Sequence, residues 1–112
     1  MSAFAFVRDH GAIVPMLWSY EASNAVLVAE RRGRLTRGDA ARMVELLHAL
    51  PVEVEEGEPD LRRLTDLARE FDLSTYHACY LDLALTSGWP LATRDSRLKE
   101  AALRAGAEVF PA

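Results

Sequence analysis

The sequence contains a single cysteine and no long apolar segment. Cys79 cannot form an internal disulfide, and a lone thiol suits a reducing cytosol. No apolar run approaches the roughly 18 residues that a membrane span needs, and no signal peptide is visible at the start of the chain. We therefore expect a cytoplasmic protein without a membrane span, in which Cys79 is a buried structural residue.

The motifs of several enzyme classes are missing as well. The chain has no Walker-type loop, no GxGxxG pattern and no nucleophile-elbow sequence. Its three histidines are scattered and do not have the spacing of a zinc site. These absences argue against a phosphate-binding loop, a dinucleotide-binding domain, a serine hydrolase and a zinc site.

The 112 residues are 50% hydrophobic and 27% charged, which is ordinary for a globular protein. This length allows one hydrophobic core and leaves no room for a second, so we predict a single domain over residues 1–112. With a net charge of −4, the protein as a whole does not attract nucleic acid. Basic residues nevertheless gather in two stretches, which either hold phosphates or form solvated helix faces. These are Arg31, Arg32, Arg34, Arg37 and Arg42 in the first, and Arg94, Arg97, Lys99 and Arg104 in the second.

Helical and strand patterns alternate along the chain. Thr36 and Asp39 resemble a capping box, and Asp60 and Ser74 are suited to cap two later helices. The patterns predict helices over 3–10, 17–32, 36–50, 60–71, 75–87 and 96–105, and strands over 12–15, 52–55, 91–93 and 108–110. Short strands that alternate with helices predict an α/β fold, in which helices cover a short parallel sheet.

Two carboxylates, Glu21 and Asp95, occupy unusual positions. Glu21 falls on an apolar stripe of its helix with Leu17 and Val28, and Asp95 follows the apolar strand 91–93. A charge among buried side chains is costly unless a basic partner or a metal ion compensates it. Ligands of parallel sheets bind beyond the carboxyl ends of the strands, and both residues follow such an end. We therefore expect both carboxylates to converge in one crevice.

Each candidate also has a structural explanation. Glu21 could be a capping or ion-paired residue near a helix N-terminus, where negative charge is favoured. Asp95 could cap the last helix, a role that is compatible with metal binding. His77 lies on an apolar stripe and is either a neutral core residue or a metal ligand or polar lining of the crevice. Asp82 falls on another stripe and is expected to be solvated or at an oligomer contact, and Thr93 could place a hydroxyl beside Asp95.

Three segments together resemble the PIN-domain proteins, and VapC-type toxin ribonucleases most closely. Residues 14–25, which include Glu21, are similar to the second acidic motif of that family. Residues 73–81, with His77, resemble the third motif, and residues 91–98, with Asp95, resemble the fourth. The three motifs occur in the family's order, and the match runs from about residue 11 to residue 111.

The resemblance implies an endoribonuclease that uses Mg²⁺ or Mn²⁺ to activate water, in a three-layer α/β/α fold. Carried over residue by residue, it implies that Glu21 and Asp95 are metal ligands. His77 would be a variant catalytic ligand or a residue that lines the crevice. Thr93, Arg94 and Arg97 would then contact the RNA substrate. A homodimer and a cognate antitoxin are implied as partners.

Two departures from the family pattern affect this expectation. The third motif carries an Asp in the family, where this chain has His77. The family's first, central strand is missing, so we expect a domain that is truncated at its N-terminus. The recorded sequence could start late, a neighbouring chain could supply the strand, or the sheet could be rearranged.

With two carboxylates and a softer imidazole, metal affinity should be weak and should shift toward Mn²⁺. Activity would then be impaired. The alternative is an inactive PIN-like remnant that serves as a dimerisation or antitoxin-binding module.

Overall fold

The computed structural model describes residues 2–111 and divides them into two compact units. We call residues 6–55 the hairpin unit. The C-terminal unit consists of residues 56–111 together with the few residues before Phe6. Each unit is described by itself.

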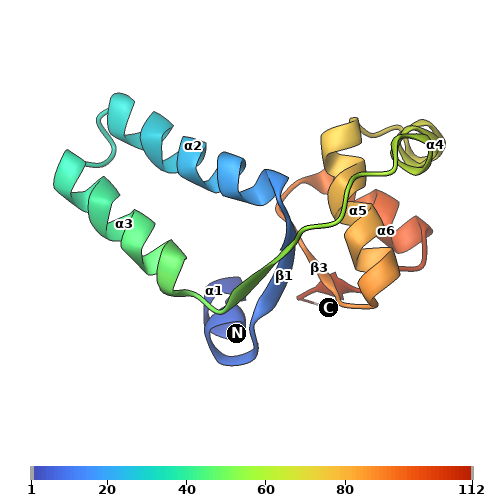
Figure 1. Cartoon of the computed structure of the whole chain (residues 1–112), viewed down its shortest axis with the longest axis horizontal. Helices are drawn as coiled ribbons and strands as arrows, with labels where there is room; N and C mark the ends of the chain where they lie inside the picture. Colours follow the sequence, from blue (N-terminus) through green and yellow to red (C-terminus); the bar gives the residue numbers. More distant parts are fainter. Residues whose placement is uncertain (1, 112) are drawn as a thin grey trace. The chain divides into compact units, whose positions relative to one another are not determined.

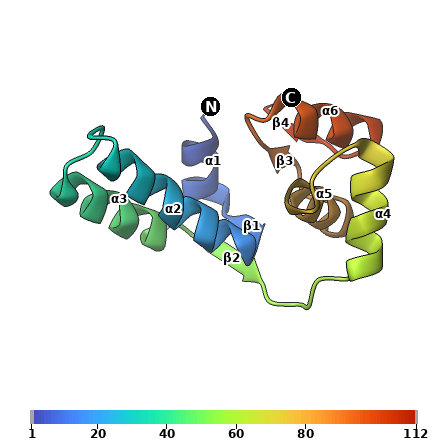
Figure 2. The same ribbon diagram turned by 90° about the horizontal axis from the view of Figure 1, so that it is seen from above.

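The hairpin unit consists of two parallel strands and a pair of long helices. It contains most of α1 (Ala3–His10), followed by β1 (Ala12–Pro15), α2 (Leu17–Arg31), α3 (Arg37–Ala49) and β2 (Val52–Glu55). Figures 1 and 2 show α2 and α3 side by side, running in opposite directions. The two strands pair in parallel, with Ala12 opposite Val52 and Pro15 opposite Glu55. The strands are thus linked through the helical hairpin, as a parallel connection requires.

The helix boundaries of the hairpin unit follow from local sequence. The predicted capping box is confirmed, because the Asp39 amide donates to Thr36 Oγ1 at 3.0 Å and the Thr36 amide donates to Asp39 Oδ2 at 3.4 Å. At the other end of the turn, Gly33 has a φ of 74°. A left-handed residue of this kind commonly ends a helix, and glycine adopts it without steric strain.

The C-terminal unit carries three helices and a second pair of parallel strands. Its elements are α4 (Leu61–Phe71), α5 (Thr75–Ser87), β3 (Leu91–Ala92), α6 (Ser96–Arg104) and β4 (Val109–Phe110). Helix α5 contacts both α4 and α6 (Figure 2). Strands β3 and β4 pair in parallel, with Leu91 opposite Val109. Asp60 and Ser74 cap α4 and α5 as predicted.

The core of the C-terminal unit is a cluster of small and aliphatic side chains from α5, β3, α6 and β4. Leu81 is fully buried, and Leu98 is 3% exposed. Three alanines let these elements approach closely, and the buried cluster consists of Leu81, Ala84, Leu91, Leu98, Ala101, Ala102 and Val109. Because this cluster joins α5 to α6, it fixes the relative position of the residues at the start of both helices.

The predicted α/β class is confirmed, with parallel pairing in both units. The predicted helices and strands are all present, and each of their ends lies within one residue of the expected one. No helix among residues 2–111 is long and apolar enough to cross a membrane.

Candidate metal-binding site

Asp95 lies between β3 and α6, and hydrogen bonds fix its position. Its Oδ1 accepts a hydrogen bond from the Leu98 amide at 2.8 Å, which makes it the N-cap of α6. Its own amide donates to Thr93 Oγ1 at 3.1 Å. The predicted capping role of Asp95 is confirmed, and Thr93 lies beside it as expected. The cap leaves Oδ2 of the carboxylate available to a further partner.

That second oxygen faces His77. His77 is the third residue of α5, and its amide donates to Ser74 Oγ at 3.1 Å. Its ring Nε2 lies 4.0 Å from Asp95 Oδ2. The structure therefore brings two of the predicted site residues together, one from the first turn of α5 and one from the cap of α6.

The His77 and Asp95 side chains are 38% and 41% exposed, so water and small ions reach them. The pair is a salt bridge only when the imidazole is protonated. When the imidazole is neutral and its Nε2 lone pair faces Asp95, two acceptor atoms oppose each other and a cation between them becomes favourable. The explanation of His77 as a buried core residue does not hold.

Core packing holds this pair in place. Leu81 lies one helical turn after His77, and Leu98 donates its amide to Asp95. Both leucines belong to the buried cluster of the C-terminal unit. The rigid core beneath the pair therefore limits how far the two side chains can separate.

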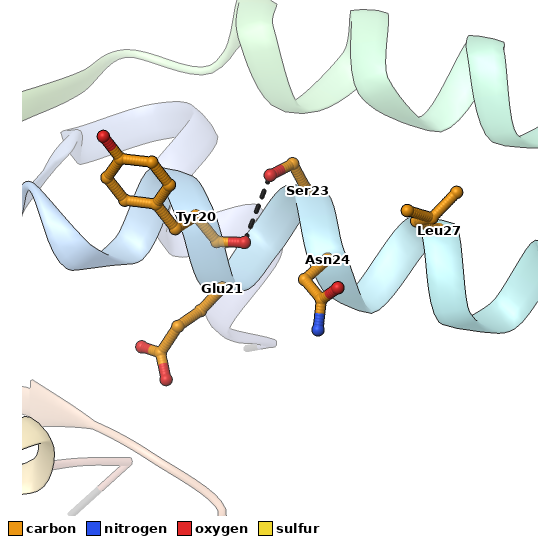
Figure 3. A pocket seen from close by; sticks show the side chains of 5 residues that line it. All are labelled: Tyr20, Glu21, Ser23, Asn24 and Leu27. Carbon is orange, nitrogen blue, oxygen red and sulfur yellow. Dashed lines mark hydrogen bonds between the residues drawn. The ribbon is translucent and has the colours of Figure 1, made fainter.

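The burial of Glu21 differs from the predicted one. It is exposed on α2, and the expectation of a buried carboxylate is wrong. The buried side of α2 runs through Ala22 and Val26 and is offset by one residue from the predicted stripe. Figure 3 shows Glu21 and Asn24 projecting from the same side of the helix. They line an open depression together with Tyr20, Ser23 and Leu27, all from α2.

Glu21 belongs to the hairpin unit, whereas His77 and Asp95 belong to the C-terminal unit. The convergence of Glu21 with Asp95 in one crevice stays a prediction. Among residues 2–111, no group of three or more His, Cys, Asp or Glu side chains is arranged to hold a metal ion. The pair by itself fits a divalent ion that keeps most of its water ligands, which is a common way to bind Mg²⁺.

The other predicted residues have clear positions. Arg94 and Arg97 are exposed on either side of Asp95, and within residues 2–111 neither side chain makes a hydrogen bond or ion pair. Asp82 is half-buried and pairs with Arg63, so it links α5 to α4. It is therefore less solvated than expected, and an oligomer contact at Asp82 stays a prediction. The sequence did not show this pairing, because 19 residues separate the two partners. Cys79 is half-buried.

Comparison with known proteins finds a likeness among solved structures. No protein-family model matches this chain, and no curated protein matches it. Among solved structures, the chain is similar to the crystal structure of PAE2754 from Pyrobaculum aerophilum, with a TM-score of 0.72 and 28% identity. The likeness covers 86% of this chain and 70% of that one. It supports the α/β fold over most of the sequence.

Proposed function

We propose that this chain is a VapC-like PIN-domain protein, a metal-dependent endoribonuclease of the cytoplasm whose activity is weak. The observation that carries the proposal is the 4.0 Å approach of His77 Nε2 to Asp95 Oδ2. Two segments that resemble successive motifs of the family thereby meet at one place, beyond the carboxyl end of a parallel strand.

The two side chains have separate roles in this proposal. Asp95 supplies a carboxylate oxygen for Mg²⁺ or Mn²⁺, while its other oxygen stays bound to the Leu98 amide and keeps the group oriented. His77 supplies a nitrogen ligand, which favours Mn²⁺ over Mg²⁺. A bound divalent ion would activate water and neutralise charge on the scissile phosphate. Arg94 and Arg97, exposed beside Asp95, would attract the RNA backbone.

Glu21 remains a proposed third ligand on the strength of the family resemblance. With only two ligands from the C-terminal unit, affinity for the ion is low, which is the physical reason for weak activity. A substitution that restores the family's acidic residue should therefore raise activity. His77→Asp is expected to increase cleavage in Mg²⁺, because a carboxylate suits this hard ion better than an imidazole does.

The test is cleavage of a labelled single-stranded RNA in Mn²⁺. Asp95→Asn keeps a capping side chain but loses the charge, and it should lower the rate by at least about tenfold. Asp66→Asn is the matched control, because its side chain is 75% exposed on α4 and the charge change is identical. Equal rates for wild type and Asp95→Asn would refute the proposal.

The alternative function is an inactive PIN-like remnant that dimerises or binds an antitoxin. Large apolar side chains exposed on α2 and α3 favour it, among them Leu27, Met43, Val44 and Leu46. Groups of exposed apolar residues commonly mark interaction surfaces. If the chain neither binds Mn²⁺ nor cleaves RNA, but self-associates and becomes monomeric on Leu46→Glu, the alternative is supported.

A further inference from the structure

Four arginines lie at the turn between α2 and α3. All four are exposed, and among residues 2–111 none of their side chains makes an ion pair or a hydrogen bond. We call them the hairpin arginines: Arg31, Arg32, Arg34 and Arg37. Arg42, the fifth basic residue of this stretch, differs because it pairs with Asp39.

The backbone beneath the hairpin arginines is well defined. The Gly33 amide donates to Glu30 O at 3.0 Å, and the Arg34 amide donates to Ala29 O at 2.9 Å. On the far side of the turn, the capping box of Thr36 starts α3. The fold of this turn therefore depends on main-chain bonds, a glycine and a cap. The turn lies at one end of the helical hairpin (Figure 1).

Helix electrostatics explain only part of this cluster. Arg31, in the last turn of α2, is favoured by the partial negative charge at a helix C-terminus. Arg37 is the first residue of α3, where the partial positive charge of the helix N-terminus disfavours a cation. A concentration of positive charge also contrasts with the net charge of −4 over the chain. Such a cluster is suited to a polyanion outside the protein.

We propose that the hairpin arginines bind the phosphate backbone of single-stranded RNA. Guanidinium groups form two parallel hydrogen bonds to phosphate oxygens and remain charged at every accessible pH. Between Leu27 and Met43 no large apolar side chain is exposed, so the turn lacks the apolar anchor of a membrane site and the apolar centre of a protein interface. The choice of RNA rests on the proposed function; the anion-binding chemistry does not.

The test is fluorescence anisotropy of a labelled 20-nucleotide oligouridylate, with EDTA present so that no metal contributes. The variant is Arg32→Gln/Arg34→Gln/Arg37→Gln. Arg31 is kept, because its positive charge is favourable at the C-terminus of α2. A control variant removes the same number of charges from exposed arginines elsewhere, at Arg8, Arg62 and Arg69. Of these, Arg8 pairs with Asp9 and Arg69 pairs with Asp66.

The first variant should bind at least about tenfold more weakly at low salt, and it should reduce the slope of log affinity against log salt by about 2. The control should bind nearly as the wild type does. Circular dichroism on each variant checks that the helices remain.

The inference is overturned if the wild type does not bind the oligonucleotide, or if both triple variants lose affinity equally. It is also overturned if the arginines are needed only for binding to phosphatidylserine vesicles. Failure of the proposed function is distinguishable, because binding is measured in EDTA and therefore does not depend on the metal site. Arginine-dependent binding without Mn²⁺-dependent cleavage would therefore refute the nuclease and leave this inference standing.

Discussion

Leu81 is the largest fully buried side chain among the described residues, and its removal should weaken the C-terminal unit strongly. Leu81→Ala removes three side-chain carbons, Cγ and both methyl groups, from a cluster built from α5, β3, α6 and β4. Much of that cluster is alanine, which cannot move to fill the space. We therefore expect a cost near the upper part of the known range for buried leucines, about 3–5 kcal/mol.

The assay is urea unfolding followed by far-UV circular dichroism. Leu103→Ala is the matched control, because Leu103 lies on α6 in the same unit but is 59% exposed, and it should cost less than about 1 kcal/mol. If Leu81→Ala does not fold, Leu81→Met keeps most of the volume and should cost less than about 1.5 kcal/mol. Equal costs for the two alanine variants would refute the core described above.

Three further predictions concern surface contacts. Thr36→Ala should destabilise the protein by about 1 kcal/mol through loss of the α3 cap, whereas Thr36→Ser should be nearly neutral in the same urea assay. The hydrogen bond from the Thr36 side chain, and then the Arg42 guanidinium, lower the pKa of Asp39 below its ordinary value of 3.8. The stability that Asp39 contributes is thus present above its ordinary pKa and is lost as the pH falls through the lower pKa of the folded state. Asp39→Asn should therefore flatten the acid limb of a pH–stability curve. A double-mutant cycle on Arg63 and Asp82, whose side chains are 45% and 24% exposed, should give a coupling free energy of about 0.5–1 kcal/mol. Zero coupling would show that the ion pair does not stabilise the protein.

Local signals in the sequence predicted most of the fold. Thr36, Ser74 and Asp95 cap helices as expected, because a capping side chain acts on amides only two or three residues away. The alternation of short strands with helices also predicted parallel pairing correctly. These features depend on neighbours along the chain, and a single sequence contains that information.

Features that depend on distant contacts were harder to predict. Glu21 was assigned to the wrong side of α2, because Leu17 and Val28 suggested a stripe one residue away from the buried one at Ala22 and Val26. The partner of Asp82 was missed because Arg63 lies on another helix. Only the resemblance to the family motifs indicated that His77 lies near Asp95. Helical periodicity alone also allowed His77 to be a core residue.

The measurement that tests the central claim most directly is a Mn²⁺ titration followed by NMR of the histidine side chains. Paramagnetic Mn²⁺ broadens signals near its site, and His10 and His48 serve as internal references in the same spectrum. We predict selective broadening of the His77 ring signals, which disappears in Asp95→Asn. Equal broadening of all three histidines, or broadening of His77 that persists in Asp95→Asn, would contradict the assignment of His77 and Asp95 as a metal site.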